Sequence, residues 1–285
     1  MKTTNQLKQD YLYCKQIIRR HSKSFYYSFS RLPKDKANAV FAIYAFCRLA
    51  DDSVDNVISK EEQIERLEAV ERELSLFNEG IPVDKPIWRA LHDVFDRYDM
   101  DIEPFFDQLK GQRMDIDFQQ PATLDQVEKY SYYVAGSVGL MLLPIISSQS
   151  TIDLRQQAIS LGAAMQLTNI LRDIGEDYQE IHRIYLPEQL MIEASYTETD
   201  LANGVVNLAF IQIFEKIAHR ADELYDDFYK KLDYFDRDSR LPVILSAKVY
   251  RGILTSIRNN NYDCFGQENA LSAEEMEDIH QALQL

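Results

Sequence analysis

The sequence has few of the residues that interrupt helices or build compact turns. Its 285 residues include only nine glycines and eight prolines. Runs of strict apolar/polar alternation, which mark half-buried strands, are scarce. Cysteine is equally rare, because Cys14, Cys47 and Cys264 are the only three. They are too few and too scattered for a disulfide framework or a zinc site, which predicts a reducing, cytoplasmic environment.

Positive charge is also in short supply. The chain carries 46 acidic and 31 basic residues, giving a formal net charge of −15. Such a surface repels phosphate backbones, so nucleic acid is not expected as a partner. The N-terminus has no apolar region typical of a signal peptide. The most apolar segment, residues 134–146, is shorter than the roughly 20 residues of a spanning helix. We therefore expect no membrane-spanning segment.

What the sequence does contain is an apolar period of 3.6 residues. Breaks fall where proline or glycine interrupts this period, among them "RLPKD", "NEGIPVDKP" and "SRLP". No long linker divides the chain, and no repeat of 20–50 residues is present. We predict an all-α fold in a single domain spanning residues 1–285. The predicted helices cover residues 4–20, 35–58, 60–78, 84–99, 102–117, 123–146, 152–179, 187–194, 198–232, 241–260 and 272–283.

The stretch "CRLADDSVDNV" places aspartates in the continuation of an apolar helix. On a helix that turns 100° per residue, Tyr44, Arg48, Asp51 and Asp55 fall within a sector of about 60°. Asp52 lies to one side of this stripe. The pattern predicts one continuous polar stripe along a helix that is otherwise rich in Phe, Ile, Ala and Val.

A second stripe lies in "MQLTNILRDIGEDY". Here Gln166, Asn169, Asp173 and Asp177 share a sector of about 80° beside an apolar face. A single D-x-x-x-D pair is more often a solvated helix face than a site. Two such pairs, each bordered by apolar residues and aligned with an amide or a tyrosine, are harder to attribute to chance.

The two stripes need positive charge, because buried unpaired carboxylates are costly. Only Arg48 and Arg172 lie nearby in the sequence. Carboxylate and amide oxygens suit Mg²⁺, which completes its shell with water and substrate phosphates. The pattern therefore predicts a diphosphate held through several Mg²⁺ ions between two helices.

A turn rich in basic and hydroxyl groups follows the first predicted helix. It contains His21, Ser22, Lys23 and Ser24. Such groups bind phosphate oxygens, although spacing alone slightly favours an ordinary helix end with cations near the dipole. Seventeen tyrosines and 14 phenylalanines are expected mostly in the core. A subset would line an apolar tunnel, where ring faces stabilise a carbocation.

Five segments occur in the order and spacing of one known family. They are "HSKSF", "YAFCRLADDSVD", "YVAGSVGLMLLPI", "QLTNILRDIGED" and "RIYLP". The chain from about residue 13 to residue 262 resembles the squalene/phytoene synthases, and most resembles their bacterial carotenogenic branch. The resemblance implies an isoprenoid synthase fold, a helical bundle around a central cavity. It also implies Mg²⁺-dependent head-to-head condensation of two prenyl diphosphates through a cyclopropyl diphosphate, in carotenoid biosynthesis.

The resemblance also implies roles for particular residues. Metal ligands would be Asp51, Asp55, Asn169, Asp173 and Asp177. Gly136 and Gly139 would let the helix backbone approach the substrate closely. The groups that would hold diphosphate or shape the reacting ends are His21, Ser22, Lys23, Ser24, Tyr44, Arg48, Gln166, Arg172 and Tyr250.

Substrate length and reduction are separate predictions. Phe29 and Phe41 would shorten a tunnel if they point into it, which favours farnesyl diphosphate and dehydrosqualene over geranylgeranyl diphosphate and phytoene. No G-x-G-x-x-G fingerprint is present, and we expect no NADPH. Members of the family often carry a basic residue after the "NNYD.F" segment, where this chain has Gln267 and Glu268.

Other classes of protein fit less well. A metal phosphohydrolase needs several spaced histidines, and the chain has only five in all. A di-iron bundle needs two E-x-x-H motifs, and only Glu277 and His280 form one. The non-enzyme alternative is an acidic helical scaffold with both stripes in solvent. Transient contact with a membrane surface would serve product release, although no basic amphipathic helix marks it.

Overall fold

The computed structural model describes residues 4–55, 59–267 and 269–284, and within these ranges every regular element is a helix. The first elements are α1 (Thr4–His21), α2 (Lys23–Phe29), α3 (Lys34–Asp55), α4 (Lys60–Asn78), α5 (Pro86–Arg97) and α6 (Glu103–Ile116). The middle elements are α7 (Leu124–Ser131), the π-helical η1 (Tyr132–Gly136), α8 (Ser137–Ile146), α9 (Arg155–Arg172) and α10 (Ile174–Ile181). The last are α11 (Glu188–Ala194), α12 (Glu198–Ala202), α13 (Leu208–Tyr229), the 3₁₀-helical η2 (Leu232–Tyr234), α14 (Arg237–Asn259) and α15 (Ala273–Gln284).

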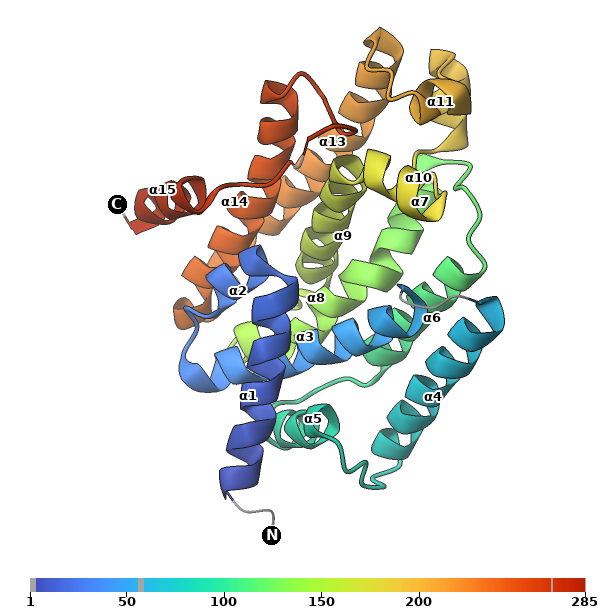
Figure 1. The fold of residues 1–285 in the computed structure, drawn as a ribbon. Helices are drawn as coiled ribbons and strands as arrows, with labels where there is room; N and C mark the ends of the chain where they lie inside the picture. The colour runs from blue at the N-terminus through green and yellow to red at the C-terminus, as the bar shows by residue number, and fades with distance from the viewer. Residues whose placement is uncertain (1–3, 56–58, 268, 285) are drawn as a thin grey trace.

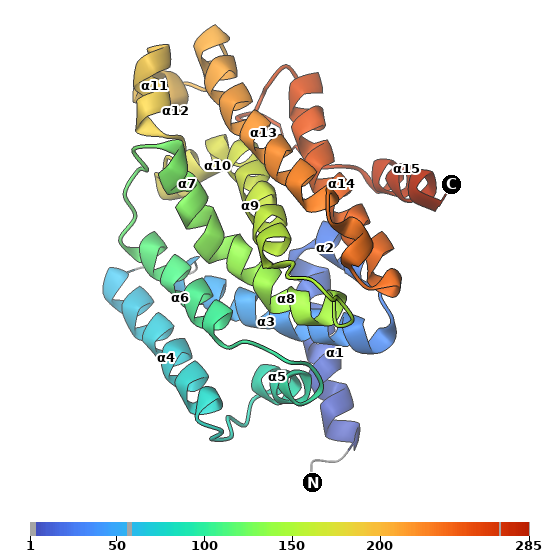
Figure 2. The same cartoon turned by 180° about the vertical axis from the view of Figure 1, so that it is seen from behind.

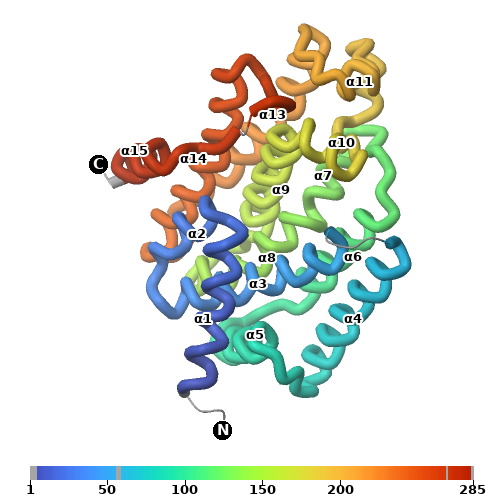
Figure 3. The backbone as a smooth tube through the Cα atoms, in the orientation of Figure 1, coloured from blue at the N-terminus to red at the C-terminus, as the bar shows by residue number. Residues whose placement is uncertain are grey.

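The long helices enclose one interior (Figure 1). α9 lies near the middle, with α13 and α14 beside it and α3 crossing below it in this view. From behind, α8 continues the line of α7 (Figure 2). α4 and α5 pack against α3, and α6 lies between α4 on one side and η1 and α8 on the other. The tube in Figure 3 shows α15 projecting sideways beside the middle of α14, after a connecting segment that follows the end of α14. The all-α fold predicted from the apolar period is confirmed.

Four predicted boundaries differ from the structure. The seven-residue α2 was not predicted, residues 198–232 form α12 and α13 with a loop between them, and the predicted 152–179 helix is broken at Asp173. Pro242 does not stop a helix but lies inside α14, where it removes one helical hydrogen bond close to the start. Residues 56–58, the predicted end of the third helix, lie outside the described residues.

The break at Asp173 has a tertiary cause. Asp173 adopts φ −101° and ψ 11° between α9 and α10. Two residues later, the Gly175 amide donates to the Cys264 carbonyl at 3.1 Å, instead of continuing the α9 ladder. A Cβ on Gly175 would lie 2.6 Å from that carbonyl oxygen. The segment around Cys264 therefore accepts the Gly175 amide, which in a continuous helix would donate to a carbonyl of α9.

Two glycines allow helices to touch backbone to backbone beside the interior. A Cβ on Gly139 in α8 would lie 2.3 Å from the Ala158 carbonyl oxygen. A Cβ on Gly162 in α9 would lie 2.3 Å from the Ala135 carbonyl oxygen. At Gly136 the nearest atoms are side-chain carbons of Tyr132 and Ile159, at 3.2 and 3.4 Å. Gly139 and Gly162 therefore make room for a neighbouring helix. That Gly136 and Gly139 also make room for substrate stays a prediction.

Replacing Gly162 by alanine is expected to lower the free energy of unfolding by about 1–3 kcal/mol, or more if the helices cannot separate, because the added methyl overlaps a backbone carbonyl. Chemical denaturation measures this change. Gly136→Ala is the matched control, since its added methyl meets only side chains and should cost less. Equal losses in the two variants would contradict the backbone contact.

Candidate active site

A cavity of about 790 Å³ lies inside the ring of helices. This volume falls in the upper part of the range of small-molecule sites, roughly 300–1,000 Å³. Its walls come from α2, α3, η1, α8, α9, α13 and α14, from the end of α1, from one residue of α6, and from α15 with the segment that leads into it. Ten of the candidate residues line it: His21, Ser22, Lys23, Ser24, Tyr44, Asp51, Gln166, Asn169, Arg172 and Tyr250. One cavity thus brings together residues from four separate parts of the sequence.

The turn at residues 21–24 is shaped by a helix cap. α1 ends at His21 with Arg19 and Arg20 in its last turn. The Ser22 hydroxyl accepts the Phe25 amide at 3.3 Å and so starts α2. This cap turns the chain at the end of α1, and residues 20–25 line the cavity. The ordinary helix-end interpretation and the binding interpretation are therefore compatible, because the cap is what places these groups.

The first acidic stripe lies in α3 as predicted. Asp51 is half-buried, lines the cavity and accepts a hydrogen bond from Gln112 Nε2 at 2.6 Å. Burial, together with the charges of Asp55 and Asp115, raises the pKa of Asp51 to about 8. Asp55, at the end of α3, is exposed. Arg48 forms an ion pair with Asp52, one turn along α3.

The second stripe straddles the break between α9 and α10. Asn169 donates to Gln166 Oε1 at 3.4 Å, and both line the cavity. Asp173 is held by Arg172 through two hydrogen bonds of 2.6 Å. Burial, together with the charges of Asp173 and Glu176, raises the pKa of Asp177 to about 7. Asp173 borders a second cavity of about 640 Å³, with Arg172 between the two cavities. Asp177 lines neither of them.

Asp115 of α6, which was not predicted as a site residue, interacts with both acidic stripes. Its negative charge raises the pKa of Asp51 in the first stripe and of Asp177 in the second. Asp115 is buried and accepts hydrogen bonds from Tyr130 at 3.0 Å and Tyr185 at 3.2 Å. The Arg183 guanidinium lies 3.2 Å from its carboxylate.

The signals for this network were present in the sequence. Gln108, Gln112 and Asp115 recur at helical spacing in α6, and a wheel of that segment would have shown a third polar stripe. Arg183 and Tyr185 belong to "RIYLP", a segment already singled out for its resemblance.

The donor set suits a hard divalent cation. Asn169 Oδ1 is buried without a hydrogen-bond partner, so it has a free oxygen lone pair beside the carboxylates. Arg48 Nε is likewise buried and unpartnered, which suits an anion. In the part of the chain that the structure describes, no three His, Cys, Asp or Glu side chains gather around one point that could hold a metal. Mg²⁺ does not require three, since one or two carboxylates with substrate phosphates and water satisfy it.

The cavity body is apolar and aromatic. The ring centroids of Phe25 and Phe29 are 4.6 Å apart, and Phe25 lies 6.0 Å from Tyr44 and 6.4 Å from Tyr250. Phe29 lines the cavity, whereas Phe41 packs against Tyr26 at 5.9 Å. Phe41 is absent from the described cavity wall, so it gives no information about substrate length.

Where other members of the family often carry a basic residue after the "NNYD.F" segment, this chain has Gln267, which is polar and uncharged. Gln267 borders the second cavity together with Arg172 and Asp173. Glu268 lies outside the described residues.

The sequence model of the squalene/phytoene synthases matches residues 18–275, so the chain belongs to the squalene/phytoene synthase family. It is therefore a prenyltransferase-type synthase. A 15-cis-phytoene synthase of Synechococcus elongatus is 38% identical over 270 residues, covering 91% of this chain and 87% of that protein. A 4,4′-diapophytoene synthase of Staphylococcus haemolyticus is 34% identical over 261 residues, 90% of each chain.

Among solved structures, a dehydrosqualene synthase crystallised with a ligand superimposes with a TM-score of 0.93 at 41% identity, covering 98% of this chain and 97% of that one. The predicted family and fold are thereby confirmed. None of the helices in the described part of the chain combines the length and the hydropathy needed to span a bilayer.

Proposed function

We propose that this protein, as one domain spanning residues 1–285, condenses two farnesyl diphosphates head to head into dehydrosqualene (4,4′-diapophytoene) without NADPH. The observation that carries the proposal is a single cavity with ionisable and amide groups at one end and an apolar, aromatic body. One relative is named a phytoene synthase and another a 4,4′-diapophytoene synthase, and both names support the condensation reaction. Phytoene synthesis from geranylgeranyl diphosphate is therefore the second candidate.

The polar end suits two diphosphate groups. His21, Ser22, Lys23 and Ser24 supply donors from one side, and Arg172 supplies a guanidinium from the other. Bound Mg²⁺ would be held by Asp51, Asp55, Asn169, Asp173 and Asp177, and would neutralise the charge that develops on the departing diphosphate. Arg172 adds positive charge at this end of the cavity. Arg48 does not line the cavity but borders a neighbouring surface pocket with His21, and its charge acts on Asp51. Binding would require Arg172 to exchange Asp173 for substrate, because these two side chains now pair with each other.

The apolar end protects the allylic cation. Helical walls exclude water, which would otherwise capture the cation. The faces of Phe25, Phe29 and Tyr44 offer cation–π stabilisation, worth about 2 kcal/mol when desolvated. Phe29 on the cavity wall favours the fifteen-carbon substrate. Transfer of the hydrocarbon product to a membrane surface stays a prediction.

Incubation of the purified protein with Mg²⁺ and either farnesyl or geranylgeranyl diphosphate tests the proposal. We expect a thirty-carbon hydrocarbon that retains the central double bond, in a yield unaffected by NADPH, identified by its mass. A forty-carbon product formed in preference would establish phytoene synthesis instead. A thirty-carbon product that lacks the central double bond and requires NADPH would contradict the non-reductive reaction.

A further inference from the structure

The cavity is closed at the end remote from Asp51 by apolar side chains. Four of them come from different elements: Ile146 ends α8, Phe228 lies in α13, Phe235 precedes α14 and Val243 lies in α14. We call these four residues the cavity floor. All are nearly inaccessible, and the rings of Phe228 and Phe235 meet at 5.6 Å between centroids. A floor assembled from separate segments keeps its place only if something holds those segments together.

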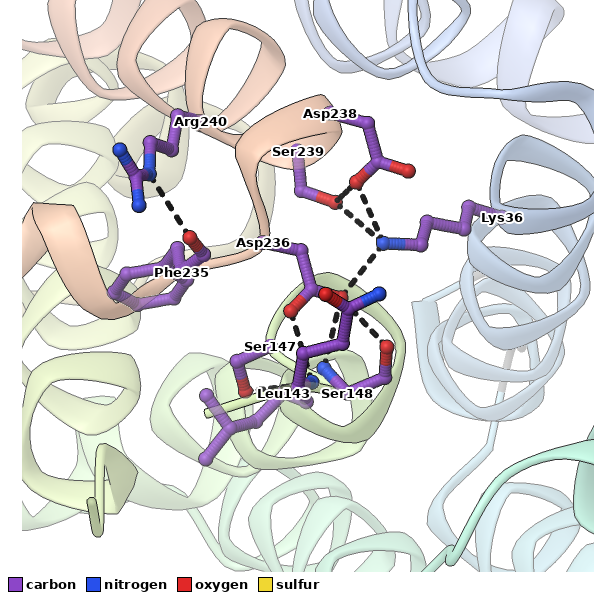
Figure 4. A network of polar contacts seen from close by, with 10 residues as sticks. Lys36, Leu143, Ser147, Ser148, Phe235, Asp236, Asp238, Ser239 and Arg240 are labelled. Carbon is purple, nitrogen blue, oxygen red and sulfur yellow. Dashed lines mark hydrogen bonds and ion pairs between the residues drawn. The ribbon is translucent and has the colours of Figure 1, made fainter. Parts of the chain in front are cut away.

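A buried ion pair between Lys36 and Asp236 lies next to the floor residue Phe235 (Figure 4). Lys36, in the first turns of α3, donates to Asp236 at 2.7 Å, to Asp238 at 2.7 Å and to Ser239 at 3.1 Å. An ammonium group has three donors, and all three are used. Along α3 this lysine is 15 residues from Asp51, a rise of about 22 Å. The pair is thus outside the polar end of the cavity.

Asp236 connects a third segment to the pair. Its carboxylate accepts the Ser148 hydroxyl at 2.6 Å and the backbone amides of Ser148 and Gln149, each at 2.9 Å. Its own backbone amide donates to the Ile146 carbonyl at 3.0 Å. We call Lys36, Ser148 and Asp236 the floor clamp. The clamp joins α3, the turn after α8 and the start of α14. Asp236 directly follows the floor residue Phe235, and Ser148 lies two residues after the floor residue Ile146.

Lys36 and Asp236 both favour their charged forms despite their burial. The side chains of Lys36 and Asp236 are 11% and 2% exposed. Burial alone would raise the pKa of Asp236, but hydrogen bonds from Lys36, Ser148 and Gln149 outweigh burial, and the pKa is lowered. Burial alone would lower the pKa of Lys36, and its bonds to Asp236 and Asp238 reverse that effect. A buried ion pair contributes little net stability compared with apolar packing, which leaves positional specificity as the property that this arrangement supplies.

We propose that Lys36 and Asp236 are positioning residues that set the length of prenyl chain the cavity accepts. The inference rests on the proposed condensation and deepens it. By fixing Phe235 and Ile146 relative to α3, the clamp fixes the depth of the floor. A chain one isoprene unit longer than the preferred substrate must displace the floor and therefore break or stretch the clamp. Phe29 narrows the wall, whereas the clamp limits the depth.

The test compares the ratio of kcat/KM for geranylgeranyl over farnesyl diphosphate between wild type and Lys36→Met. We expect the ratio to rise by about tenfold or more, the scale of discrimination by an apolar pocket. Lys36→Arg keeps the charge and should retain most of the wild-type ratio. If Lys36→Met does not fold, Ser148→Ala removes one clamp hydrogen bond, keeps the ion pair, and should raise the ratio by a smaller factor.

The chain supplies a matched control. Arg89 and Asp10 form an ion pair between α5 and α1 whose side chains are also 11% and 2% exposed, and neither lines the cavity. Arg89→Met should lower the melting temperature comparably and leave the ratio unchanged. An unchanged ratio in both Lys36→Met and Ser148→Ala, with activity retained, would overturn the clamp.

The same assay separates the two proposals. A wild-type protein that condenses neither substrate would overturn the proposed function, and the clamp with it. If wild type prefers the twenty-carbon substrate, the chain-length part of the proposed function fails. The clamp is then judged by the ratio for a twenty-five-carbon over a twenty-carbon diphosphate, with the same expected direction and the same contradicting result.

Discussion

Replacing Asp51 by asparagine is expected to lower the turnover of prenyl diphosphate by on the order of a thousandfold. The amide keeps the shape of the side chain and an oxygen that accepts from Gln112 at the same place. It removes the negative charge that would hold Mg²⁺ at the cavity edge. Steady-state kinetics with Mg²⁺ in excess measures the loss. Asp35→Asn, at an exposed aspartate in the first turn of the same helix, should retain wild-type turnover.

The same substitution should not destabilise the metal-free protein. Burial raises the pKa of Asp51 to about 8, whereas a free aspartate titrates near pH 4. Between about pH 4 and pH 8 the folded state therefore holds a proton that the unfolded state has released. The folded state therefore becomes less stable relative to the unfolded state as the pH rises through that window. Asp51→Asn abolishes the loss, so with a chelator present its melting temperature should exceed that of wild type at pH 8.

The two readouts identify what Asp51 does. Lower turnover with equal or higher stability indicates that Asp51 serves the reaction and that its buried carboxylate lowers the stability of the fold. Lower turnover together with lower stability at every pH would contradict the metal-binding role and indicate a structural one.

Replacing Asp115 by leucine is expected to lower the free energy of unfolding by about 3–5 kcal/mol, the cost of leaving one member of a buried ion pair without its partner. The Arg183 side chain is 14% exposed and its guanidinium lies 3.2 Å from the Asp115 carboxylate. The hydroxyls of Tyr130 and Tyr185 would lose their acceptor as well. Chemical denaturation with a two-state fit measures the change.

A neighbouring aspartate controls for position in the chain. Asp117 pairs with Lys60 at the surface, where the two side chains are 65% and 55% exposed. Asp117→Leu should change stability by no more than about 0.5 kcal/mol. A small effect for Asp115→Leu as well would show that the Asp115 network is not the coupled, desolvated cluster described above.

Periodicity predicted those parts of the site that lie within one helix. Asp51 and Tyr44 follow from α3 alone, and Gln166 and Asn169 from α9 alone, because side chains one turn apart share a face. Asp173 and Asp177 do not lie on the same helix face as Gln166 and Asn169, because α9 ends before Asp173 and Asp177 belongs to α10. A hydrogen bond from Gly175 to a residue almost 90 positions later interrupts the helix, and no local pattern contains that information.

Other features of the site could not be predicted from the sequence, because they depend on contacts between distant segments. α2 is only seven residues long, too short for a clear period. Asp115 and Arg183 are single charges from different elements, and their role depends on each other's position. Phe29 and Phe41 are the same residue type beside the same motifs, yet only Phe29 faces the cavity. The fold class was therefore predictable from composition and period, while the assembly of the site from several helices was not.

The glycine contacts divide the cavity wall into two mechanically different sides. α9 meets η1 and α8 at Gly162 and Gly139 with no side chain between the backbones, so these helices have almost no freedom to slide or part. On the opposite side, Leu271 and Met276 reach the cavity from a segment that packs on α14 through a small hydrophobic cluster of its own. When a bulky hydrocarbon must pass, the outward displacement should therefore fall on the α15 side, and amide hydrogens there should exchange with solvent before those of α9.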